Sequence, residues 1–167
     1  MAAKFQRITP FFWFNDNAED AATYYASVFP DSKLGEAARY TEEAARATGQ
    51  KPGSVMTQPF ELAGQQFTAI NGGPHFTFNE AISLVVNCDS QAEIDHYWDK
   101  LGAGGPPQAQ QCGWLKDRFG VSWQVVPRDI AELMSPAGDP ARPGRVMAEV
   151  MKMKKIDLDT LRRAAKG

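Results

Sequence analysis

The sequence predicts an α+β fold of two βαβββ modules, whose curved mixed sheets surround a cleft, with a C-terminal helical tail. Two segments repeat one pattern 56 positions apart, at 64–70 and 120–126. Each is a Gly turn followed by an alternating strand with an aromatic residue at the fourth place, and each follows an amphipathic helical pattern, at 18–29 or 90–101. An internal repeat fixes the architecture, and two curved units set side by side would enclose a cavity.

The length suits one domain, because 167 residues can bury a sizeable core. We expect a single domain over 1–167, with module one at about 5–73, module two at about 79–128 and the helical tail at about 129–167. The helices of the two modules lie further apart in sequence than their last strands do. The first module therefore carries about 20 extra residues, mostly in the polar stretch 41–53.

The first module starts with an apolar, aromatic run that predicts a strand, and Pro10 indicates the start of that strand or an edge position. A helix follows, because small and aromatic residues recur at helical spacing behind a polar segment with helix-cap chemistry. The stretch 36–39 fits a strand or a helix equally well, and 41–53 is a short helix or loop. The last two strands form a hairpin across Ala63 and Gly64. The predicted elements are strand 8–14, helix 18–29, strand 34–40 and strands 55–62 and 66–71, with the helix stripe Ala18, Ala21, Ala22, Tyr25, Val28 and Phe29 buried.

The second module begins after a break at 72–74, where two glycines and a proline interrupt the pattern. Its helix opens with a capping box, since Glu93 follows Ser90 at the third position. Asp117 lies in the turn between the last two strands, and we expect its carboxylate to accept backbone amides. The predicted elements are strand 81–88, a helix with the stripe Ile94, Tyr97, Trp98 and Leu101, strands 110–116 and 121–126, and helical segments at about 129–135, 141–154 and 157–166.

The composition is that of a soluble globular protein, with 43% hydrophobic and 23% charged residues. No apolar run approaches the roughly 20 residues of a membrane span, and the first residues lack the apolar core of a signal peptide. Cys88 and Cys112 make neither a disulfide framework nor a CxxC pair. We therefore expect no membrane association and a cytoplasmic, reducing location.

The charge is uneven along the chain. Residues 141–167 hold eight Lys and Arg against three Asp and Glu, while the rest of the chain is acidic, so that the net charge is −2. A basic tail can bind nucleic acid, but no aromatic residue interleaves with these charges. We therefore expect the tail to dock on an acidic surface of this chain or of a partner subunit, rather than on nucleic acid.

Several runs of residues together carry a family resemblance. Paired βαβββ units with these runs are similar to the vicinal oxygen chelate superfamily, which includes glyoxalase I, extradiol dioxygenases, and bleomycin and fosfomycin resistance proteins. The nearest branch is the PhnB-like one, often labelled 3-demethylubiquinone 3-methyltransferase-like. The resemblance implies two curved sheets around a cleft and a homodimer, but it implies no particular reaction. The runs that carry it are 8–14, 24–32, 67–76, 79–83, 112–118 and 120–124.

Enzymes of this superfamily hold a divalent metal with His, Glu or Gln side chains from the first and last strands of each module, as the resemblance implies. The matching positions here are Pro10, Thr68, Ala81 and Gln124, with Glu80 one residue away from the third. Proline and alanine offer no donor atom, and one glutamine does not make a metal site. We therefore expect no metal and no cofactor, although a divalent metal at other residues stays an alternative.

Strand alternation predicts which side chains face the cleft. If the ligand positions face inward, the cleft is mainly apolar and aromatic, with two hydroxyls and one amide in the second module, while Phe67, Val121, Trp123 and Val125 face the helices. Such a lining suits a small, partly apolar organic ligand. The predicted ligand-cleft residues are Phe12, Phe14, Thr68, Ile70, Ser83, Ser122 and Gln124.

His75 is the candidate acid or base, because a histidine pKa suits neutral pH and Glu80 lies nearby in sequence. The plainer alternative is a histidine that fixes a loop by hydrogen bonds. Methyl transfer with S-adenosylmethionine is disfavoured, because the glycines at 102–105 follow a helix and 72–74 open no convincing helix. Neither cysteine has the cationic surroundings that activate a nucleophile, apart from Lys116 near Cys112.

The leading hypothesis is a metal-independent, homodimeric protein that binds a small organic molecule. The second is an enzyme of the same superfamily, a lyase, isomerase or dioxygenase, or the methyltransferase of the family label, working through His75 and Glu80 or through an unexpected metal. The third is a structural or regulatory dimer without a ligand.

Overall fold

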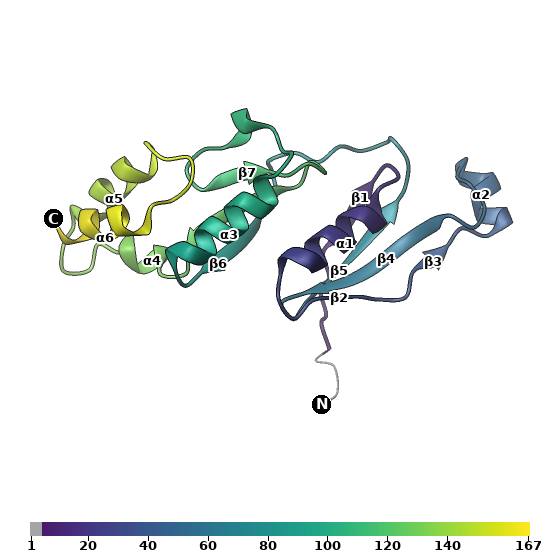
Figure 1. The fold of residues 1–167 in the computed structure, drawn as a ribbon, viewed down its shortest axis with the longest axis horizontal. Coiled ribbons are helices and arrows are strands. Elements are labelled where there is room, and N and C mark those ends of the chain that lie inside the picture. Colours follow the sequence, from purple (N-terminus) through teal and green to yellow (C-terminus); the bar gives the residue numbers. More distant parts are fainter. Residues whose placement is uncertain (1–4) are drawn as a thin grey trace. The chain divides into compact units, whose positions relative to one another are not determined.

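The computed structural model describes residues 5–167 and consists of two compact units, one ending at Phe78 and the other spanning Asn79–Gly167. Each unit holds one mixed sheet with helices, so the predicted α+β class with two sheets and C-terminal helices is confirmed (Figure 1). No helix in the described part of the chain has the length and hydropathy needed to span a bilayer.

The sheet of the first unit has the strand order β1-β5-β4-β2, with β3 also paired to β4. The edge strand β1 runs parallel to β5, and the other pairs are antiparallel. The extra residues of this unit form two short strands and one helix, which ends at Gly49 with a φ of 74°. In chain order the elements are β1 (Phe11–Phe14), α1 (Ala18–Val28), β2 (Lys33–Leu34), β3 (Ala38–Arg39), α2 (Glu42–Thr48), β4 (Val55–Leu62) and β5 (Gln65–Asn71).

Helix α1 covers one face of this sheet and supplies the core of the unit. Its predicted apolar stripe is buried, and it meets strand residues such as Phe60, whose ring lies 6.3 Å from that of Tyr25. Phe60 and Phe67, neighbours on β4 and β5, stack with ring centroids 5.2 Å apart. Such aromatic pairs add about 1 kcal/mol each to the stabilisation from burial.

The first turn of α1 is held by a residue from the far end of the unit. Asn17 occupies the N-cap position, but its side chain caps nothing. Instead, Ala18 N donates to Asn71 Oδ1 on β5 at 2.8 Å, and Asn71 Nδ2 donates to Val55 O at 3.1 Å. Tyr40 Oη donates to Asn71 O at 2.7 Å. Buried Asn71 thus joins α1, β4 and the segment before α2.

The β4–β5 hairpin turns on Ala63 and Gly64, as the sequence predicts, with φ values of 46° and 81°. Left-handed φ at both central residues is typical of the tight hairpin turn that prefers Asn-Gly. Alanine resists that conformation because its Cβ crowds the backbone.

We expect Ala63→Asn to raise the free energy of unfolding by about 0.5–1 kcal/mol, measured by urea denaturation. Ala37→Asn, at a partly exposed loop residue with negative φ, is the control, and an equal gain there would contradict the explanation.

The second unit has a three-stranded sheet of order β6-β8-β7, with β6 parallel to β8. It is shorter than the βαβββ repeat predicts, because within the described residues 79–167 the stretch between α3 and β7 forms a loop with a 3₁₀ turn at Pro107–Ala109. Prolines 106 and 107 lack the N–H groups that a strand there would donate. The elements are β6 (Leu84–Cys88), α3 (Gln91–Gly102), β7 (Trp114–Lys116) and β8 (Ser122–Pro127).

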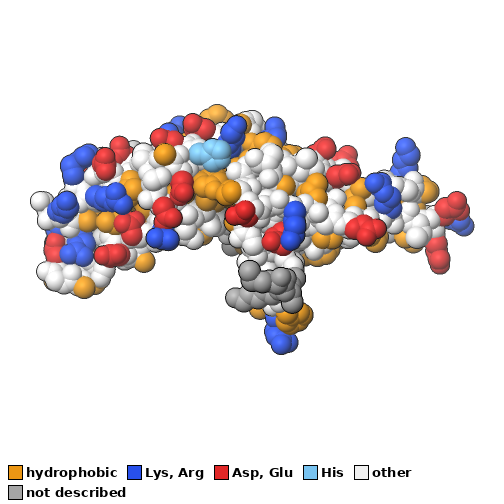
Figure 2. Space-filling model, turned by 60° about the horizontal axis from the view of Figure 1, so that its bottom comes forward, with side chains coloured by type: hydrophobic (Ala, Val, Ile, Leu, Met, Phe, Trp, Pro, Cys, Tyr) orange, Lys and Arg blue, Asp and Glu red, His pale blue; other side chains and the backbone are white. Residues whose placement is uncertain are grey.

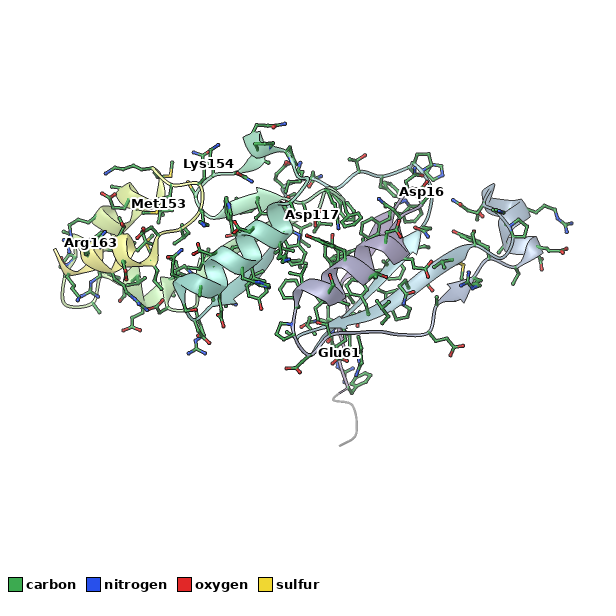
Figure 3. All side chains as sticks on the ribbon, in the orientation of Figure 1. Asp16, Glu61, Asp117, Met153, Lys154 and Arg163 are labelled. Atoms are coloured by element: carbon green, nitrogen blue, oxygen red, sulfur yellow. The ribbon has the colours of Figure 1, made fainter. Side chains whose placement is uncertain are left out.

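The C-terminal helices are tied to the rest of the second unit through backbone and side-chain bonds. They are α4 (Ile130–Leu133), α5 (Arg142–Val150) and α6 (Leu158–Lys166). Cys112 N and Gly113 N donate to Met153 O and Lys154 O, both at 2.8 Å, in the loop between α5 and α6 (Figure 3). Gln91 on α3 donates to Ile156 O and accepts from Leu158 N. Lys155 forms an ion pair with Asp95 at 2.7 Å, so the basic tail does meet an acidic side chain of its own chain.

Candidate functional site

Each sheet has one face covered by its helix and one face that is not, which we call the open face. On the first sheet, the register places Phe11 beside Thr68 and Trp13 beside Ile70. These four alternate with residues buried against α1, such as Phe12, so they lie on the open face. Binding side chains are commonly held on such uncovered surfaces, so the open faces are the candidate surfaces for a site.

The prediction that Phe12 and Phe14 share a face with Thr68 and Ile70 is wrong. Phe12 lies beside Ala69, and Phe14 lies beside Asn71. Both rings are nearly buried, 9% and 3% exposed, and they pack in the core. The prediction counted alternate residues from Pro10, which is one residue too early. Thr68 N donates to the Pro10 carbonyl, but the register partner of Thr68 is Phe11. Phe67 faces the core, as predicted.

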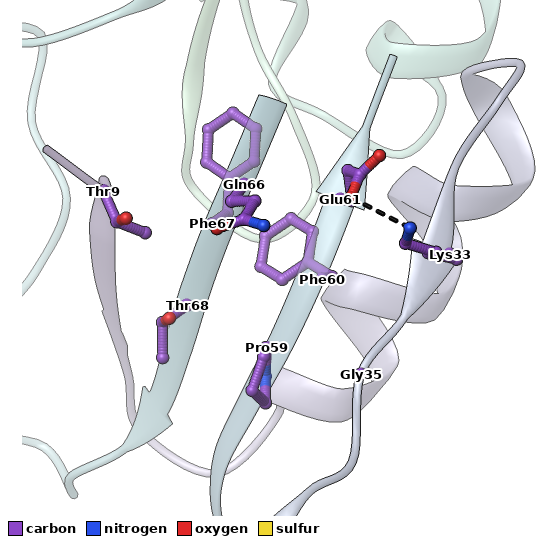
Figure 4. Close-up of a pocket in the computed structure, with 9 residues that line it drawn as sticks. All are labelled: Thr9, Lys33, Gly35, Pro59, Phe60, Glu61, Gln66, Phe67 and Thr68. Carbon is purple, nitrogen blue, oxygen red and sulfur yellow. Dashed lines mark ion pairs between the residues drawn. The ribbon is translucent and has the colours of Figure 1, made fainter. Parts of the chain in front are cut away.

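The open face of the first sheet carries a pocket of about 300 Å³ (Figure 4). Its lining comes from neighbouring strands in two rows. In one row, Lys33 pairs with Glu61, which pairs with Gln66. In the next, Pro59 lies beside Thr68, and Gly35 N donates to Pro59 O at 2.8 Å. Thr9 closes one end, and Phe60 and Phe67 complete the lining.

The pocket is open because the residues of its second row have small side chains that do not fill it. Gly35 has none, and a Cβ added there would lie 3.0 Å from Pro59 Cβ. The surrounding groups are polar: the hydroxyls of Thr9 and Thr68, and the ion pair of Lys33 Nζ with Glu61 Oε2 at 3.1 Å. The pocket therefore offers hydroxyl groups and an ion pair on the open side of β4 and β5, whose Phe60 and Phe67 rings pack in the core on the other side.

The open face of the second sheet gathers three predicted cleft residues. Val85 lies beside Gln124, and Ser122 lies two residues before Gln124 on β8, so alternation places them on one face. Gln124 Nε2 donates to Ser83 Oγ at 2.8 Å. Ser122 is 3% exposed, and its Oγ has no hydrogen-bond partner among residues 5–167. A buried hydroxyl without a partner costs about 1–3 kcal/mol, so the Ser122 hydroxyl is a candidate ligand contact on this face.

Lys116 on β7 is the register partner of Ser122 on β8. Its ammonium group is bound to a carboxylate rather than to the Ser122 hydroxyl. Its Nζ forms an ion pair and hydrogen bond with Glu80 Oε1. The bond from Lys116 lowers the pKa of Glu80 below the usual carboxyl value. Glu80 is therefore an anion at neutral pH, and the geometry assigns it to Lys116.

His75 lies in an exposed loop of the first unit, where its ring is 6.4 Å from that of Trp13 in an edge-on arrangement. Trp13 Nε1 donates to Gly73 O at 2.9 Å, and its indole covers Gly72 so closely that a Cβ there would lie 2.1 Å from a ring carbon. Phe76 meets the same indole at 5.0 Å. The contacts of His75 are thus those of an aromatic loop cluster.

Asp117 plays the turn role that the sequence predicts. Its Oδ1 accepts Phe119 N at 2.8 Å and Val121 N at 3.0 Å, while Oδ2 accepts Trp123 Nε1 at 2.8 Å. The residue is 1% exposed and lies where β7 ends (Figure 3). The bond to the Trp123 indole was not foreseen, because it joins two residues whose side chains meet only in the folded hairpin.

Of the four positions that the resemblance matches to metal ligands, Pro10 and Ala81 lie before the strands β1 and β6, while Thr68 lies on β5 and Gln124 on β8. The register partners of Thr68 and Gln124 are Phe11 and Val85. Ala81 precedes β6, because its N–H donates to Asn79 Oδ1 in a turn. Pro10 and Ala81 have no donor atom, and neither have the register partners Phe11 and Val85, so the Thr68 hydroxyl and the Gln124 amide alone make a poor donor set for a divalent cation. The residues at these positions do not fit the metal that the fold family implies.

A family model for 3-demethylubiquinone-9 3-methyltransferase matches residues 6–126. The chain belongs to this family. A putative 3-demethylubiquinone-9 3-methyltransferase, PhnB protein, from Bacillus cereus is 36% identical with a TM-score of 0.63, over 73% of this chain and 99% of that chain. Curated proteins give no match.

More distant solved structures share the fold of the family. Protein PA1353 from Pseudomonas aeruginosa is 23% identical with a TM-score of 0.56, over 72% of this chain and 96% of that chain. The fosfomycin resistance protein FosX from Mesorhizobium loti is 16% identical with a TM-score of 0.52, over 79% of this chain and 97% of that chain. The predicted likeness to the PhnB branch and to the vicinal oxygen chelate fold is confirmed.

Sequence reasoning missed most of the pocket on the first sheet. Of its lining residues only Thr68 was predicted to bind a ligand. The others come from separate segments and meet only through strand pairing, and the one available signal was the unusual Gly35 and Pro59 in stretches predicted as strands.

Proposed function

We propose that this member of the family binds a small, partly apolar organic molecule in the pocket on the open face of its first sheet. The observation that carries the proposal is the pocket of about 300 Å³ between Lys33, Glu61 and Thr68. Ligand pockets in proteins start at about this volume and combine apolar walls with a few polar groups that orient the ligand. The hydroxyls of Thr9 and Thr68 would give that orientation.

The open face of the second sheet carries its own polar groups, which would bind a ligand within the second unit. The Ser122 hydroxyl is buried without a partner, and Gln124 and Ser83 are bonded to each other beside it. In a chain without a ligand, such a hydroxyl is an uncompensated cost, which a ligand carbonyl or hydroxyl would remove. Ser83, Ser122 and Gln124 therefore stay in the proposed ligand-binding set. Phe12 and Phe14 leave it because they pack in the core, and Ile70 leaves it because it lies outside the pocket.

We propose binding without a metal, because the side chains at the superfamily's metal positions are poor donors. We also propose that the protein is cytoplasmic and acts as a homodimer. Light scattering of the 18.4 kDa chain would test the dimer. The methyltransferase in the family's description finds little support in the fold. The glycines after β5 lead into a turn at 74–75, and no helix starts there to hold a cofactor's anionic group.

The proposal is tested by a fragment screen that follows thermal stability, with and without Mn, Fe, Ni, Co and Zn salts. For the hits, we expect Thr68→Leu to raise the dissociation constant at least tenfold, because leucine fills the pocket and removes a hydroxyl. Ile70→Leu is the matched control, since it changes the same open face of β5 outside the pocket. Equal binding by Thr68→Leu and wild type, or binding that requires a metal, would overturn the proposal.

A further inference from the structure

A second pocket lies among the C-terminal helices, in residues beyond the family match at 6–126. We propose that this pocket binds an oxyanionic group, a carboxylate or a phosphate, of a small molecule. Its volume is about 250 Å³, enough for an anion with a short organic part. Helices α4, α5 and α6 all contribute walls, so the pocket forms only when the three helices are packed together.

Arg142 at the start of α5 is the residue that points to an anion. Its Nε is buried and has no hydrogen-bond partner among the described residues. A guanidinium N–H is charged and strongly polar, so leaving it unpaired inside the protein is costly. Arg142 lines the pocket, so an oxyanion there would accept an Nη–H and, after a rotation of the side chain that uncovers Nε, this N–H too, in the forked geometry that arginine offers to carboxylates and phosphates.

The neighbouring arginine on α5 shows what a structural arginine looks like in this tail. Arg145 donates from Nη2 to Asp139 Oδ2 at 2.6 Å and from Nε to Ala164 O at 3.0 Å, which ties α5 to the end of α6. The Nε of Arg142, only one turn earlier, has no hydrogen-bond partner in the described part of the chain, and its charge acts on Asp139 only as a weaker cause, behind Arg145, of that carboxyl's lowered pKa. The difference indicates that Arg142 is placed for something other than holding the helices together.

The charges around the pocket leave a surplus for an anion. Arg142, Arg162 and Lys166 face it together with Asp129 and Glu132, so the balance is about one positive charge at neutral pH. Arg162 is held by Asp129 at 3.7 Å. This leaves Arg142 and Lys166 against the single carboxylate of Glu132. Figure 2 shows such clusters of Lys and Arg side chains among acidic ones on the surface at the end where the helical tail lies.

The test uses the full chain and titrates it with inorganic phosphate or with succinate, at ionic strength held constant with sodium chloride. Calorimetry or NMR shifts of the tail amides give the dissociation constants. We expect binding by at least one of the two probes, and the stronger one identifies the group as phosphate or carboxylate. Arg142→Met should weaken that binding at least tenfold, and Arg142→Lys, which keeps the charge without the fork, should weaken it nearly as much.

Arg163→Met is the matched control, because Arg163 lies exposed on α6 outside the pocket and loses the same charge (Figure 3). It should change the dissociation constant less than twofold. Without anion, Arg142→Met should unfold at the same or a higher urea concentration than wild type, since it removes an unpaired buried N–H. The proposal is overturned if neither probe binds better than chloride, if Arg163→Met loses as much binding as Arg142→Met, or if Arg142→Met destabilises the free protein. Thr68→Leu should leave anion binding unchanged, so this test is separate from that of the first pocket.

Discussion

Replacing Asp117 with asparagine is expected to lower the free energy of unfolding by about 3 kcal/mol. The buried carboxylate accepts three N–H groups and is bonded on both oxygens. An asparagine keeps one acceptor oxygen for the two backbone amides, but its NH₂ group then faces the N–H of Trp123. Two donors meet there, so the bond to Trp123 is lost, and the indole N–H and the asparagine NH₂ stay unpaired. Urea denaturation followed by tryptophan fluorescence would measure the loss.

A double-mutant cycle separates this mechanism from a general effect of removing charge. Trp123→Phe takes away the indole N–H, so Asp117→Asn should cost about 1–2 kcal/mol less in that background than in wild type. Asp99→Asn, at an exposed residue of α3, is the control and should change stability by less than about 0.5 kcal/mol. The same cost for Asp117→Asn in both backgrounds would show that the indole bond does not carry the effect.

We expect Asn71→Leu to destabilise the protein by about 3 kcal/mol as well. Leucine has a similar volume, but it leaves Ala18 N and Val55 O without their partners in the core. The first turn of α1 then loses its only described side-chain acceptor, a loss that costs about 1 kcal/mol for ordinary N-caps. Chemical denaturation gives the total, and hydrogen exchange at the first turn of α1 gives the local part.

Asn87→Leu is the matched control for that substitution. Asn87 is an exposed strand residue on β6, where the same change removes no buried bond. We expect its effect to stay within about 0.5 kcal/mol. If Asn71→Leu were as mild as Asn87→Leu, the cap from β5 to α1 would contribute little to the fold.

The sequence predicted the fold well wherever a single segment carries the signal. The apolar stripe of α1, the hairpin at Ala63 and Gly64, and the turn role of Asp117 all depend on residues close together in the chain. It failed where distant strands meet. The face of Phe12 depends on the pairing of β1 with β5, and a slip of one residue moves every side chain to the other face.

The candidate site was only partly predictable for the same reason. Ser83, Ser122 and Gln124 lie on or beside uninterrupted strands, so alternation placed them together. The pocket on the first sheet needs the register of β2, β4 and β5 at once, which no local pattern contains. The burial of the unpaired Arg142 Nε depends on how three short helices pack, and neither residue spacing nor composition predicts it.

The close cover of Gly72 by the Trp13 indole has a consequence for how related chains evolve. Because a Cβ at position 72 would overlap the indole, no other residue fits there while the tryptophan keeps its place. The two positions should therefore change as a pair, with a side chain at 72 accepted only in lineages where a smaller residue stands at 13. An aligned set of relatives can be sorted by this pair alone, and those with both residues should share the turn that carries His75 and Phe76.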